Sequence, residues 1–272
     1  MLPGKYYQKE EMNKIRIAVK VGSNVLTRAD GRLDVARMAA LVDQIAELRK
    51  NGYEVLLISS GAVASGRGEL PGLSSDDVEV RQLFAAVGQA KLIEHYYDLF
   101  KEYGITVGQI LTTRENFVEP ELMENQKRCM TAMLANDIIP VINENDVVSI
   151  KELMFTDNDE LSGLVARMMG AKKLIILSNV DGVFTGNPED PASELIREIP
   201  AGKDFSSFVT SQKSSLGRGG MATKMGTASQ VAADGISVII ANGKRTDVLI
   251  DVVLHPESAI CTKFLTPEES KS

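Results

Sequence analysis

The sequence predicts an α/β fold, a three-layer α/β/α sandwich whose central sheet is mostly parallel. Two observations predict it. Short apolar segments of strand length alternate with longer segments of helical period, and nearly every apolar segment ends in a cluster of small or polar residues. Apolar strands that alternate with helices are typical of parallel sheets covered on both faces. In such sheets ligands bind beyond the carboxyl ends of the strands, so the polar clusters predict where a site lies.

Strands are expected where short apolar runs end in a turn. In chain order they are residues 15–21, 54–59, 105–112, 138–142, 173–177 and 236–241. Runs of this length without a helical period fit strands that are buried on both faces. The first strand ends in a glycine turn, the second in small residues and the fourth in asparagines and acids. The fifth ends in Ser178-Asn179 and the last in Asn242-Gly243.

Helices are expected between these strands, where apolar residues recur every three or four positions. In chain order they are residues 33–50, 80–103, 125–136, 161–169 and 222–233. Gly52 and Gly104 follow the first two helices, and glycine is a common residue just past a helix end. The polar residues 194–215 show no period and are interpreted as a hairpin or flap. Only a short tail is expected after Val253.

Composition limits the class of protein. The chain has 272 residues, 44% of them hydrophobic, so it can bury a large core and is expected to form one domain over residues 1–272. The formal net charge is −7 and the basic residues are scattered, which argues against a nucleic-acid groove. No apolar run approaches the roughly 20 residues of a membrane helix, and the polar first residues do not form a signal peptide.

The two cysteines, Cys129 and Cys261, lie far apart and without metal-binding spacing. A chain with so few cysteines has no disulfide framework, which fits a reducing compartment. We therefore expect a cytoplasmic protein whose partners are neither nucleic acids nor membranes.

The glycine-rich loop at residues 217–224, Gly-Arg-Gly-Gly-Met-Ala-Thr-Lys, is the most informative stretch. Adjacent glycines let the backbone approach a ligand closely and adopt positive φ at low cost. A helical pattern begins directly after them, so free N–H groups, a positive helix end and Lys224 converge. This predicts an anion site, most plausibly for phosphate. The loop is not a P-loop, because it does not match G-x-x-x-x-G-K-[ST].

Two further turns follow the first two strands. Lys20 is the last charged residue before the turn at Gly22, where it can reach a phosphate. Ser60, Gly61 and Ala62 leave room for a ligand, and backbone N–H groups ahead of a helix bind carboxylate or phosphate. Each turn alone is compatible with an ordinary strand end. Beside the glycine loop, a functional interpretation is favoured.

Two acidic clusters come later in the chain. Residues 143–146, Asn-Glu-Asn-Asp, can hold an amino group and a carboxylate through charge-assisted hydrogen bonds; a solvated turn is the alternative. Residues 156–159, Thr-Asp-Asn-Asp, open a helix, so either Asp157 or Asp159 can be its N-cap while the other acts in the site. Calcium is rejected because the later glycine and glutamate of an EF-hand loop are missing. Residues 178–184 form either a plain turn or one wall of a nucleoside site.

These stretches, in this order, resemble the amino-acid kinase superfamily and, within it, the glutamate 5-kinase branch. The asparagine-rich stretch together with Gly-Gly-Met-x-Thr-Lys is specific to that branch, whereas uridylate kinase, aspartokinase and acetylglutamate kinase share the sheet and the first lysine but not this pair. The resemblance runs from Lys20 to about Gly243. The matching segments are residues 19–23, 59–62, 141–146, 157–162, 180–184 and 219–224.

The resemblance implies a reaction, ATP-dependent phosphorylation of the L-glutamate γ-carboxylate, and a role for each matching residue. Lys20 and Lys224 would contact the transferred phosphoryl group, and Asp159 would orient them. Mg²⁺ would be carried mainly by ATP, without a protein metal site. The implied glutamate contacts are Ser60, Gly61, Ala62, Asn143, Asp146 and Asn158. The implied ATP contacts are Lys20, Gly22, Ser178, Asn179, Arg218, Gly219, Gly220, Met221, Ala222, Thr223 and Lys224. Residues of about 15–170 would bind glutamate and about 171–262 ATP.

The resemblance also implies partners. Members of the branch are dimers or tetramers, are inhibited by proline and pass an unstable acyl phosphate to glutamate-5-phosphate reductase. This chain has Ser178-Asn179 where the branch often has Thr-Asp, and Arg218 where it often has a small residue. The appended C-terminal PUA domain of many bacterial members is not expected. There are two alternatives: a sister kinase for acetylglutamate or UMP, and an amino-acid sensor that has kept the fold. A sensor should have lost Lys20 or Lys224, and both are present, which argues against it.

Overall fold

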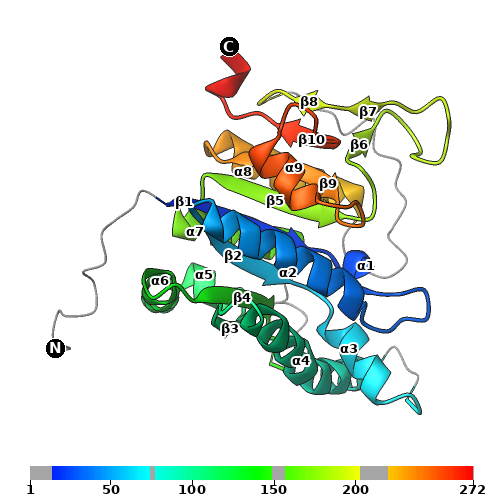
Figure 1. Ribbon diagram of the computed structural model, residues 1–272, viewed down its shortest axis with the longest axis vertical. Coiled ribbons are helices and arrows are strands. Elements are labelled where there is room, and N and C mark those ends of the chain that lie inside the picture. The colour runs from blue at the N-terminus through cyan, green and yellow to red at the C-terminus, as the bar shows by residue number, and fades with distance from the viewer. Residues whose placement is uncertain (1–13, 74–76, 149–156, 203–219, 272) are drawn as a thin grey trace, which may run out of the picture.

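The computed structural model describes residues 14–73, 77–148, 157–202 and 220–271. Across these residues an eight-stranded sheet runs through the molecule, with helices on both of its faces (Figure 1). The predicted α/β/α sandwich with a mostly parallel sheet is therefore confirmed. Two residues expected to bind ATP, Arg218 and Gly219, lie outside the described residues.

The strand order of the sheet is β3-β4-β2-β1-β5-β9-β10-β8. The strands are β1 (Ile15–Val21), β2 (Tyr53–Ser59), β3 (Val107–Thr112), β4 (Ile139–Glu144), β5 (Lys173–Ser178), β8 (Glu198–Ile199), β9 (Ser237–Asn242) and β10 (Cys261–Phe264). All neighbours are parallel except β9 and β10. A separate antiparallel pair joins β6 (Val183–Phe184) and β7 (Leu195–Ile196). The central strand β1 is bonded to β2 on one side and to β5 on the other.

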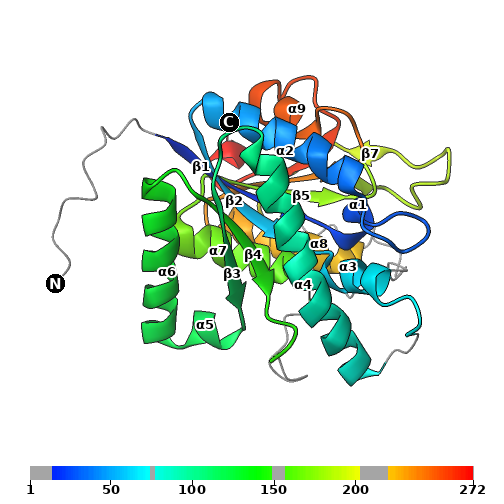
Figure 2. The same ribbon diagram turned by 60° about the horizontal axis from the view of Figure 1, so that its bottom comes forward.

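The helices cover the sheet in two layers. They are α1 (Ser23–Leu26), α2 (Val35–Lys50), α3 (Ala62–Glu69), α4 (Val78–Lys101), α5 (Glu115–Val118), α6 (Pro120–Ala135), α7 (Asn158–Met169), α8 (Met221–Ala233) and α9 (Val248–Leu254), with a 3₁₀ turn at Glu269–Lys271. One apolar core lies between the sheet and α2, α4 and α9, and the other between the sheet and α6, α7 and α8. Figure 2 shows α2 and α6 on opposite sides of the strands.

Three expectations need correction. The residues after Val253 are more than a tail, because they include β10, which pairs with β9, and the 3₁₀ turn at Glu269–Lys271. Residues 194–202, the described part of the expected hairpin or flap, do not form a hairpin. Their two strands pair with other segments instead: β7 pairs with β6, and β8 pairs with β10. A helix, α3, occupies much of the loop expected before the long helix; residues 203–215 of the proposed flap lie outside the described residues.

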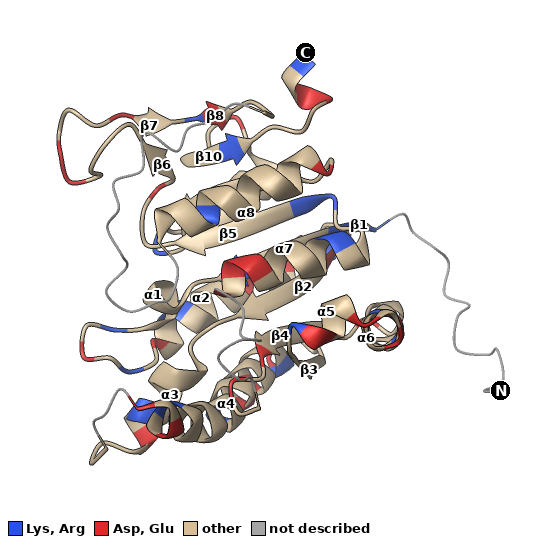
Figure 3. Cartoon of the chain, turned by 180° about the vertical axis from the view of Figure 1, so that it is seen from behind, with Lys and Arg blue, Asp and Glu red and all other residues tan. Residues whose placement is uncertain are grey.

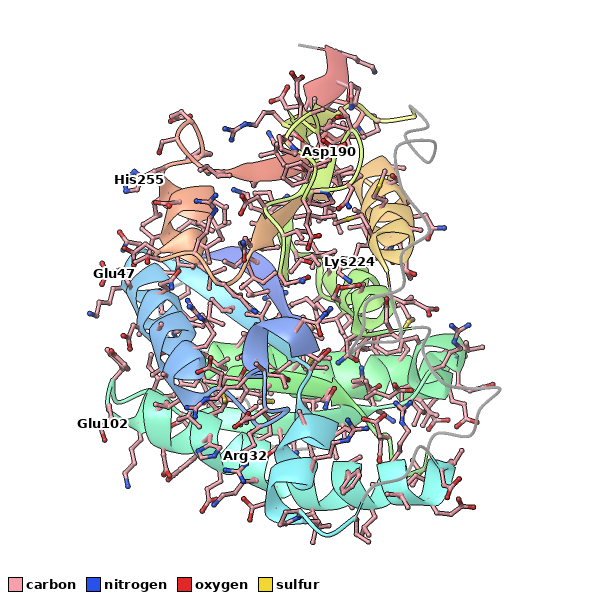
Figure 4. All side chains as sticks on the ribbon, turned by 90° about the vertical axis from the view of Figure 1, so that its right-hand side faces the viewer. Arg32, Glu47, Glu102, Asp190, Lys224 and His255 are labelled. Atoms are coloured by element: carbon pink, nitrogen blue, oxygen red, sulfur yellow. The ribbon has the colours of Figure 1, made fainter. Side chains whose placement is uncertain are left out.

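The parallel strands deliver their carboxyl ends to one side of the molecule, the right-hand side of Figure 1. On that side lie the turns that follow β1, β2, β4, β5 and β9, as the polar clusters of the sequence predict. Figure 4 looks onto this side. The geometry of the site follows from which side chains these turns bring together.

Candidate active site

Lys20 lies on the face of the sheet that α7 and α8 cover. Side chains of a strand alternate between the two faces. Val19 and Val21 of β1 belong to the core under α2, whereas Ala18 belongs to the core under α7 and α8. Lys20 continues the series of Ala18, and it is only 4% exposed. A lysine this deeply buried requires a carboxylate partner on the same face.

That partner is Asp159, the second residue of α7, which is fully buried. Its Oδ1 lies 2.6 Å from Nζ of Lys20, and its Oδ2 lies 2.9 Å from Nζ of Lys224 on α8. Each carboxylate oxygen thus holds a different ammonium group. Figure 3 shows the acidic start of α7 beside the basic position in the first half of α8, and Figure 4 places Lys224 near the middle of the carboxyl-end side.

The charges of this cluster favour an anion. Lys20 and Lys224 outnumber the one carboxylate that they share, Asp159, and Asp157 lies near enough to interact with all three charges. Burial alone would raise the pKa of Asp159, but Lys20 and Lys224 outweigh it and hold the pKa well below its usual range. Asp159 therefore stays ionised at neutral pH and holds the side chains of both lysines in place.

Asp157 is the N-cap of α7. Its Oδ1 accepts the backbone N–H groups of Asp159 and Glu160. Of the two acids that the sequence offered as caps, Asp157 takes the cap and Asp159 faces the lysines. Burial raises the pKa of Asp157, and the charge of Asp159 raises it further. Its Oδ2 is buried and has no hydrogen-bond partner among the described residues.

The N-terminus of α8 lies beside Asp159, because Lys224 in the first turns of α8 contacts that carboxylate. Gly220 is its N-cap, in an extended conformation with φ −96°, and no side chain caps the helix. The positive φ that glycine permits is therefore not used at Gly220. The first intrahelical bond of this turn runs from the N–H of Lys224 to the carbonyl of Gly220. Met221, Ala222 and Thr223 thus present their N–H groups ahead of Lys224, which suits a phosphate.

Gly22 brings the backbone close to Lys20 from the other side. A Cβ atom at Gly22 would lie 3.1 Å from the carbonyl oxygen of Leu177 and 3.6 Å from Nζ of Lys20. Gly22 is also the N-cap of α1, and its N–H donates to Leu177. A larger residue here would crowd the carbonyl of Leu177 at the end of β5 and would place its Cβ in contact with Nζ of Lys20, so the glycine leaves that side of Nζ open.

The turn after β2 has the conformation that glycine makes possible. Gly61 has φ +109° and is the N-cap of α3, and Ala62 is the first, buried residue of that helix. The N–H of Ser60 donates to the carbonyl of Val21, which ties this turn to the end of β1. The start of α3 therefore lies beside the turn that carries Gly22.

Asn158 connects this turn to β4. Its Nδ2 donates to Oγ of Ser60 at 2.8 Å and to Oδ1 of Asn143 at 3.0 Å. Asn143 is the buried fifth residue of β4, only 3% exposed. Asp146 lies in the turn after β4, half-buried. The structure thus joins three of the residues expected to bind substrate in one hydrogen-bonded group.

The two groups of side chains meet at the first turn of α7. Asn158 belongs to the hydrogen-bonded group with Ser60 and Asn143, called the amide group below. Its neighbour Asp159 belongs to the group with Lys20 and Lys224, called the lysine group below. Consecutive residues in a helix point about 100° apart, so this one turn faces both groups. The structure therefore places a cluster that suits phosphate directly beside a cluster of neutral hydrogen-bonding groups.

Comparison with known proteins gives this geometry a family. Residues 16–242 match the model of the amino acid kinase family. The chain is 62% identical, over 94% of its length and 72% of the relative's, to a glutamate 5-kinase of Bacteroides thetaiotaomicron. The chain belongs to the glutamate 5-kinases of the amino acid kinase family. A glutamate 5-kinase of Symbiobacterium thermophilum is 41% identical over 89% of this chain and 93% of its own length.

Solved structures place this family member in the same fold as more distant kinases. A carbamate kinase from Giardia lamblia aligns with TM-score 0.66 and 17% identity, over 93% of this chain and 99% of its own. A UMP kinase from Ureaplasma parvum aligns with TM-score 0.60 and 15% identity, over 94% of this chain and all of its own. At such low identity these two likenesses support the fold alone.

The residues expected on the ATP side of this glutamate 5-kinase family member are only partly joined by contacts. Ser178 is buried at the end of β5, and its carbonyl accepts the N–H of Gly243. Asn179 is exposed. Next to them Asp181 accepts from Asn242 and, through both oxygens, from Arg245. Hydrogen bonding by Arg245 lowers the pKa of Asp181. The predicted nucleoside wall is thus a turn fastened to the end of β9.

The sequence did not reveal the contribution of Gln89 in α4. Its Oε1 accepts from Nδ2 of Asn143 at 2.8 Å, so it extends the amide group by one member. A single glutamine in a long amphipathic helix is unremarkable in sequence; the glycine before it, Gly88, was the available sign of a close contact.

Two searches of the described residues complete the description. No helix among them combines the length and the apolarity needed to cross a membrane. No three His, Cys, Asp or Glu side chains in this part of the chain lie close enough together to hold a metal ion.

Proposed function

We propose that the chain transfers the γ-phosphoryl group of ATP to the γ-carboxylate of L-glutamate and forms L-glutamyl 5-phosphate, the first step of proline biosynthesis. One observation carries the proposal. The first turn of α7 holds Asp159 between Lys20 and Lys224 and, one residue earlier, Asn158 between Ser60 and Asn143. A charged group for phosphate and an amide group for an acceptor thus share one turn.

The chemistry needs no general base. A glutamate carboxylate is already ionised at neutral pH, so its oxygen attacks the γ-phosphorus directly while the bond to the leaving oxygen of ADP breaks. The demands on the protein are alignment and neutralisation of the charge on the transferred group. We assign that neutralisation to Lys20 and Lys224, with Asp159 as the group that orients them. Backbone N–H groups at the start of α8 would receive the nucleotide phosphates.

Magnesium fits this site as a companion of the nucleotide. When bound to the ATP phosphates, it supplies positive charge to them. The described residues offer the nucleotide cations and N–H groups, and Asp159 is already shared by two lysines. We therefore propose that the metal comes with ATP and that the protein contributes no dedicated metal cluster.

The remaining site residues take roles on one of the two sides. We assign glutamate binding to the residues around the turns after β2 and β4, namely Ser60, Gly61, Ala62, Asn143, Asp146 and Asn158. We assign ATP binding to Gly22, Ser178, Asn179 and the glycine loop with Arg218 and Gly219. Residues of about 15–170 would then form the glutamate part, and about 171–262 the ATP part.

A sister kinase for UMP or acetylglutamate is the alternative. Against it stand the amides and the acid at residues 143–146, which suit the free α-amino group of glutamate. Acetylglutamate has no such cation. UMP would bring a second phosphate, for which further cations would be needed on the substrate side.

Regulation and assembly follow as parts of the same proposal. Proline carries the α-carboxylate and the α-amino group of glutamate, so it would compete at the same residues. The product is an unstable acyl phosphate, which calls for a reductase that consumes it, glutamate-5-phosphate reductase. We place the reaction in the cytoplasm, where ATP is available, and expect a homodimer or homotetramer.

The test is ADP release with glutamate, aspartate, acetylglutamate and UMP as acceptors, together with hydroxylamine trapping of any acyl phosphate. We expect ADP and a hydroxamate with glutamate, and little turnover with the other three. Glutamate-independent ATP consumption, or turnover with UMP alone, would refute the assignment.

A further inference from the structure

Helix α4 backs the substrate side of the site without being part of any turn there. At one end of the contact Gly88 packs against the backbone of Ala62. At the other end the hydroxyl of Tyr96 is hydrogen-bonded to Ser59 at 2.8 Å. Between them Gln89 contacts Asn143. The helix therefore touches both the α3 turn and β4, and Gln89 is its polar contact with β4.

The hydrogen bonds that start at Gln89 have a fixed direction. The backbone N–H of Glu144 donates to Oδ1 of Asn143 at 2.9 Å. A backbone N–H can only donate, so the atom it meets must be the amide oxygen of Asn143 and not the nitrogen. The nitrogen of Asn143 then faces Gln89, which must present its own oxygen, Oε1, at 2.8 Å.

The same reasoning carries the direction into the site. Oδ1 of Asn143 also meets Asn158, which must therefore present Nδ2. That nitrogen makes its second hydrogen bond to Oγ of Ser60, so Ser60 accepts. Both hydrogens of the Asn158 amide are used, and the hydroxyl hydrogen of Ser60 is left to donate elsewhere.

The direction matters because it sets what the site offers a substrate. Ser60 offers an O–H donor, which suits a carboxylate, and Asn158 offers its carbonyl oxygen, which suits an ammonium group. If the amides were reversed, each would offer the opposite character. An α-amino acid matches the direction that the Glu144 backbone imposes.

We propose that Gln89 is a positioning residue for glutamate, through Asn143 and Asn158. The inference rests on the proposed function and deepens it. Asn143 is buried, so without an acceptor at residue 89 its NH₂ group would be left unpaired. The amide gains a new partner only by turning, and turning takes Oδ1 away from Asn158. Gln89 thus holds in place an orientation that Glu144 selects.

The experiment compares steady-state kinetics of the full chain carrying Gln89→Met with those of the unsubstituted protein. Methionine keeps the length of the side chain and removes the acceptor. We expect KM for glutamate to rise roughly tenfold, while kcat and KM for ATP stay nearly unchanged because the lysine group is untouched. Gln89→Glu keeps an accepting oxygen, so it should raise KM for glutamate less than methionine does.

A matched control lies on the same helix. Gln82 donates from Nε2 to the carbonyl of Val147, so Gln82→Met also removes a bond between α4 and the segment after β4 but leaves the amides intact. It should change KM for glutamate less than Gln89→Met does. In the Asn143→Ala background, Gln89→Met should have almost no further effect, because its target is gone.

The outcomes separate the two proposals. No glutamate-dependent turnover by the unsubstituted protein overturns the proposed function and this inference with it. With an active protein, an unchanged KM for glutamate in Gln89→Met overturns the inference alone. Equal effects of Met and Glu at residue 89, or additivity with Asn143→Ala, also overturn it. If Gln89→Met does not fold, Gln89→Ala, which also removes the acceptor, takes its place in the comparisons with Gln89→Glu and Gln82→Met, and the same outcomes decide.

Discussion

A Cβ atom at Gly88 would lie 1.8 Å from the carbonyl oxygen of Ala62. Helices α3 and α4 therefore meet backbone to backbone, and a second glycine, Gly66, makes the same kind of contact with Phe84. Because Ala62 follows Gly61 at the start of α3, the contact at Gly88 sets the distance between α4 and the turn after β2.

Gly88→Ala should push the start of α3 away from α4. We expect a loss of about 1–3 kcal/mol in the free energy of unfolding and a higher KM for glutamate, with KM for ATP little changed. Gly226→Ala is the matched control, since a Cβ atom there meets no atom within 4 Å. It should stabilise α8 by roughly 0.5–1 kcal/mol. Urea titrations and steady-state kinetics on both variants decide, and an unchanged KM for glutamate in Gly88→Ala would contradict the positional role.

Lys224→Met tests the phosphoryl side. On the proposed role of Lys224, its removal takes away one of two cations that neutralise the transferred phosphoryl group, so kcat should fall roughly 100- to 1000-fold, while circular dichroism shows a folded protein. Lys50→Met is the control, because Lys50 is exposed at the end of α2 and should leave kcat unchanged. A kcat near that of the unsubstituted protein would remove Lys224 from the reaction.

Asp159→Asn tests the charge network by its pH dependence. The pKa of Asp159 is lower in the folded protein than in the unfolded chain, so its contribution to stability is present above about pH 4, the unfolded value, and is lost as pH falls through the folded pKa. The asparagine variant should lack this acid-side loss and should be less stable at neutral pH by on the order of 3 kcal/mol, because two lysines lose their counter-ion.

The measurement is the urea midpoint at a series of pH values between 3 and 7. Asp190→Asn, in the exposed loop between β6 and β7, is the acid-to-amide control and should follow the unsubstituted protein. Parallel curves for Asp159→Asn and the unsubstituted protein would show that the carboxylate is not held by the lysines.

Thr262→Val tests how the turn after β5 is fastened. The buried hydroxyl of Thr262 in β10 accepts the N–H of Val183 and donates to the carbonyl of Ile196. Valine keeps the shape but leaves both backbone groups unpaired, so the free energy of unfolding should fall by about 1–3 kcal/mol. Thr262→Ser keeps the hydroxyl and should lose less. If the Thr262→Val and Thr262→Ser variants unfold at the same urea concentration, the hydroxyl of residue 262 does not stabilise this turn.

Much of this fold is visible in sequence because its strands are buried on both faces. The apolar run at residues 15–21 is β1 without any change of boundary. What stayed hidden depends on tertiary contacts. Gly66 and Gly68 disguise α3 in the sequence, and Gly66 is the one of the two that packs closely against α4, at Phe84. β10 is only four residues long and gains its place by pairing with β9.

The site shows the same division. Small and polar residues at strand ends predict its location, and the spacing of Asp157 and Asp159 predicts one cap and one site residue. Which acid faces the lysines depends on how α7 lies across β1, and sequence spacing contains no such information. Gln89 was missed for a similar reason, because its partner lies 54 positions away.

The central position of β1 also has a consequence for how the chain is made. Its first neighbour, β2, follows within a few dozen residues, whereas its second neighbour, β5, begins at Lys173. A nascent chain on the ribosome therefore keeps one edge of β1 open until well over half of the protein has been translated, and such long-range pairing is slow. Lys224 emerges later still. Asp159 can be flanked by both lysines only once residue 224 has been made, so shorter chains lack the assembled cluster.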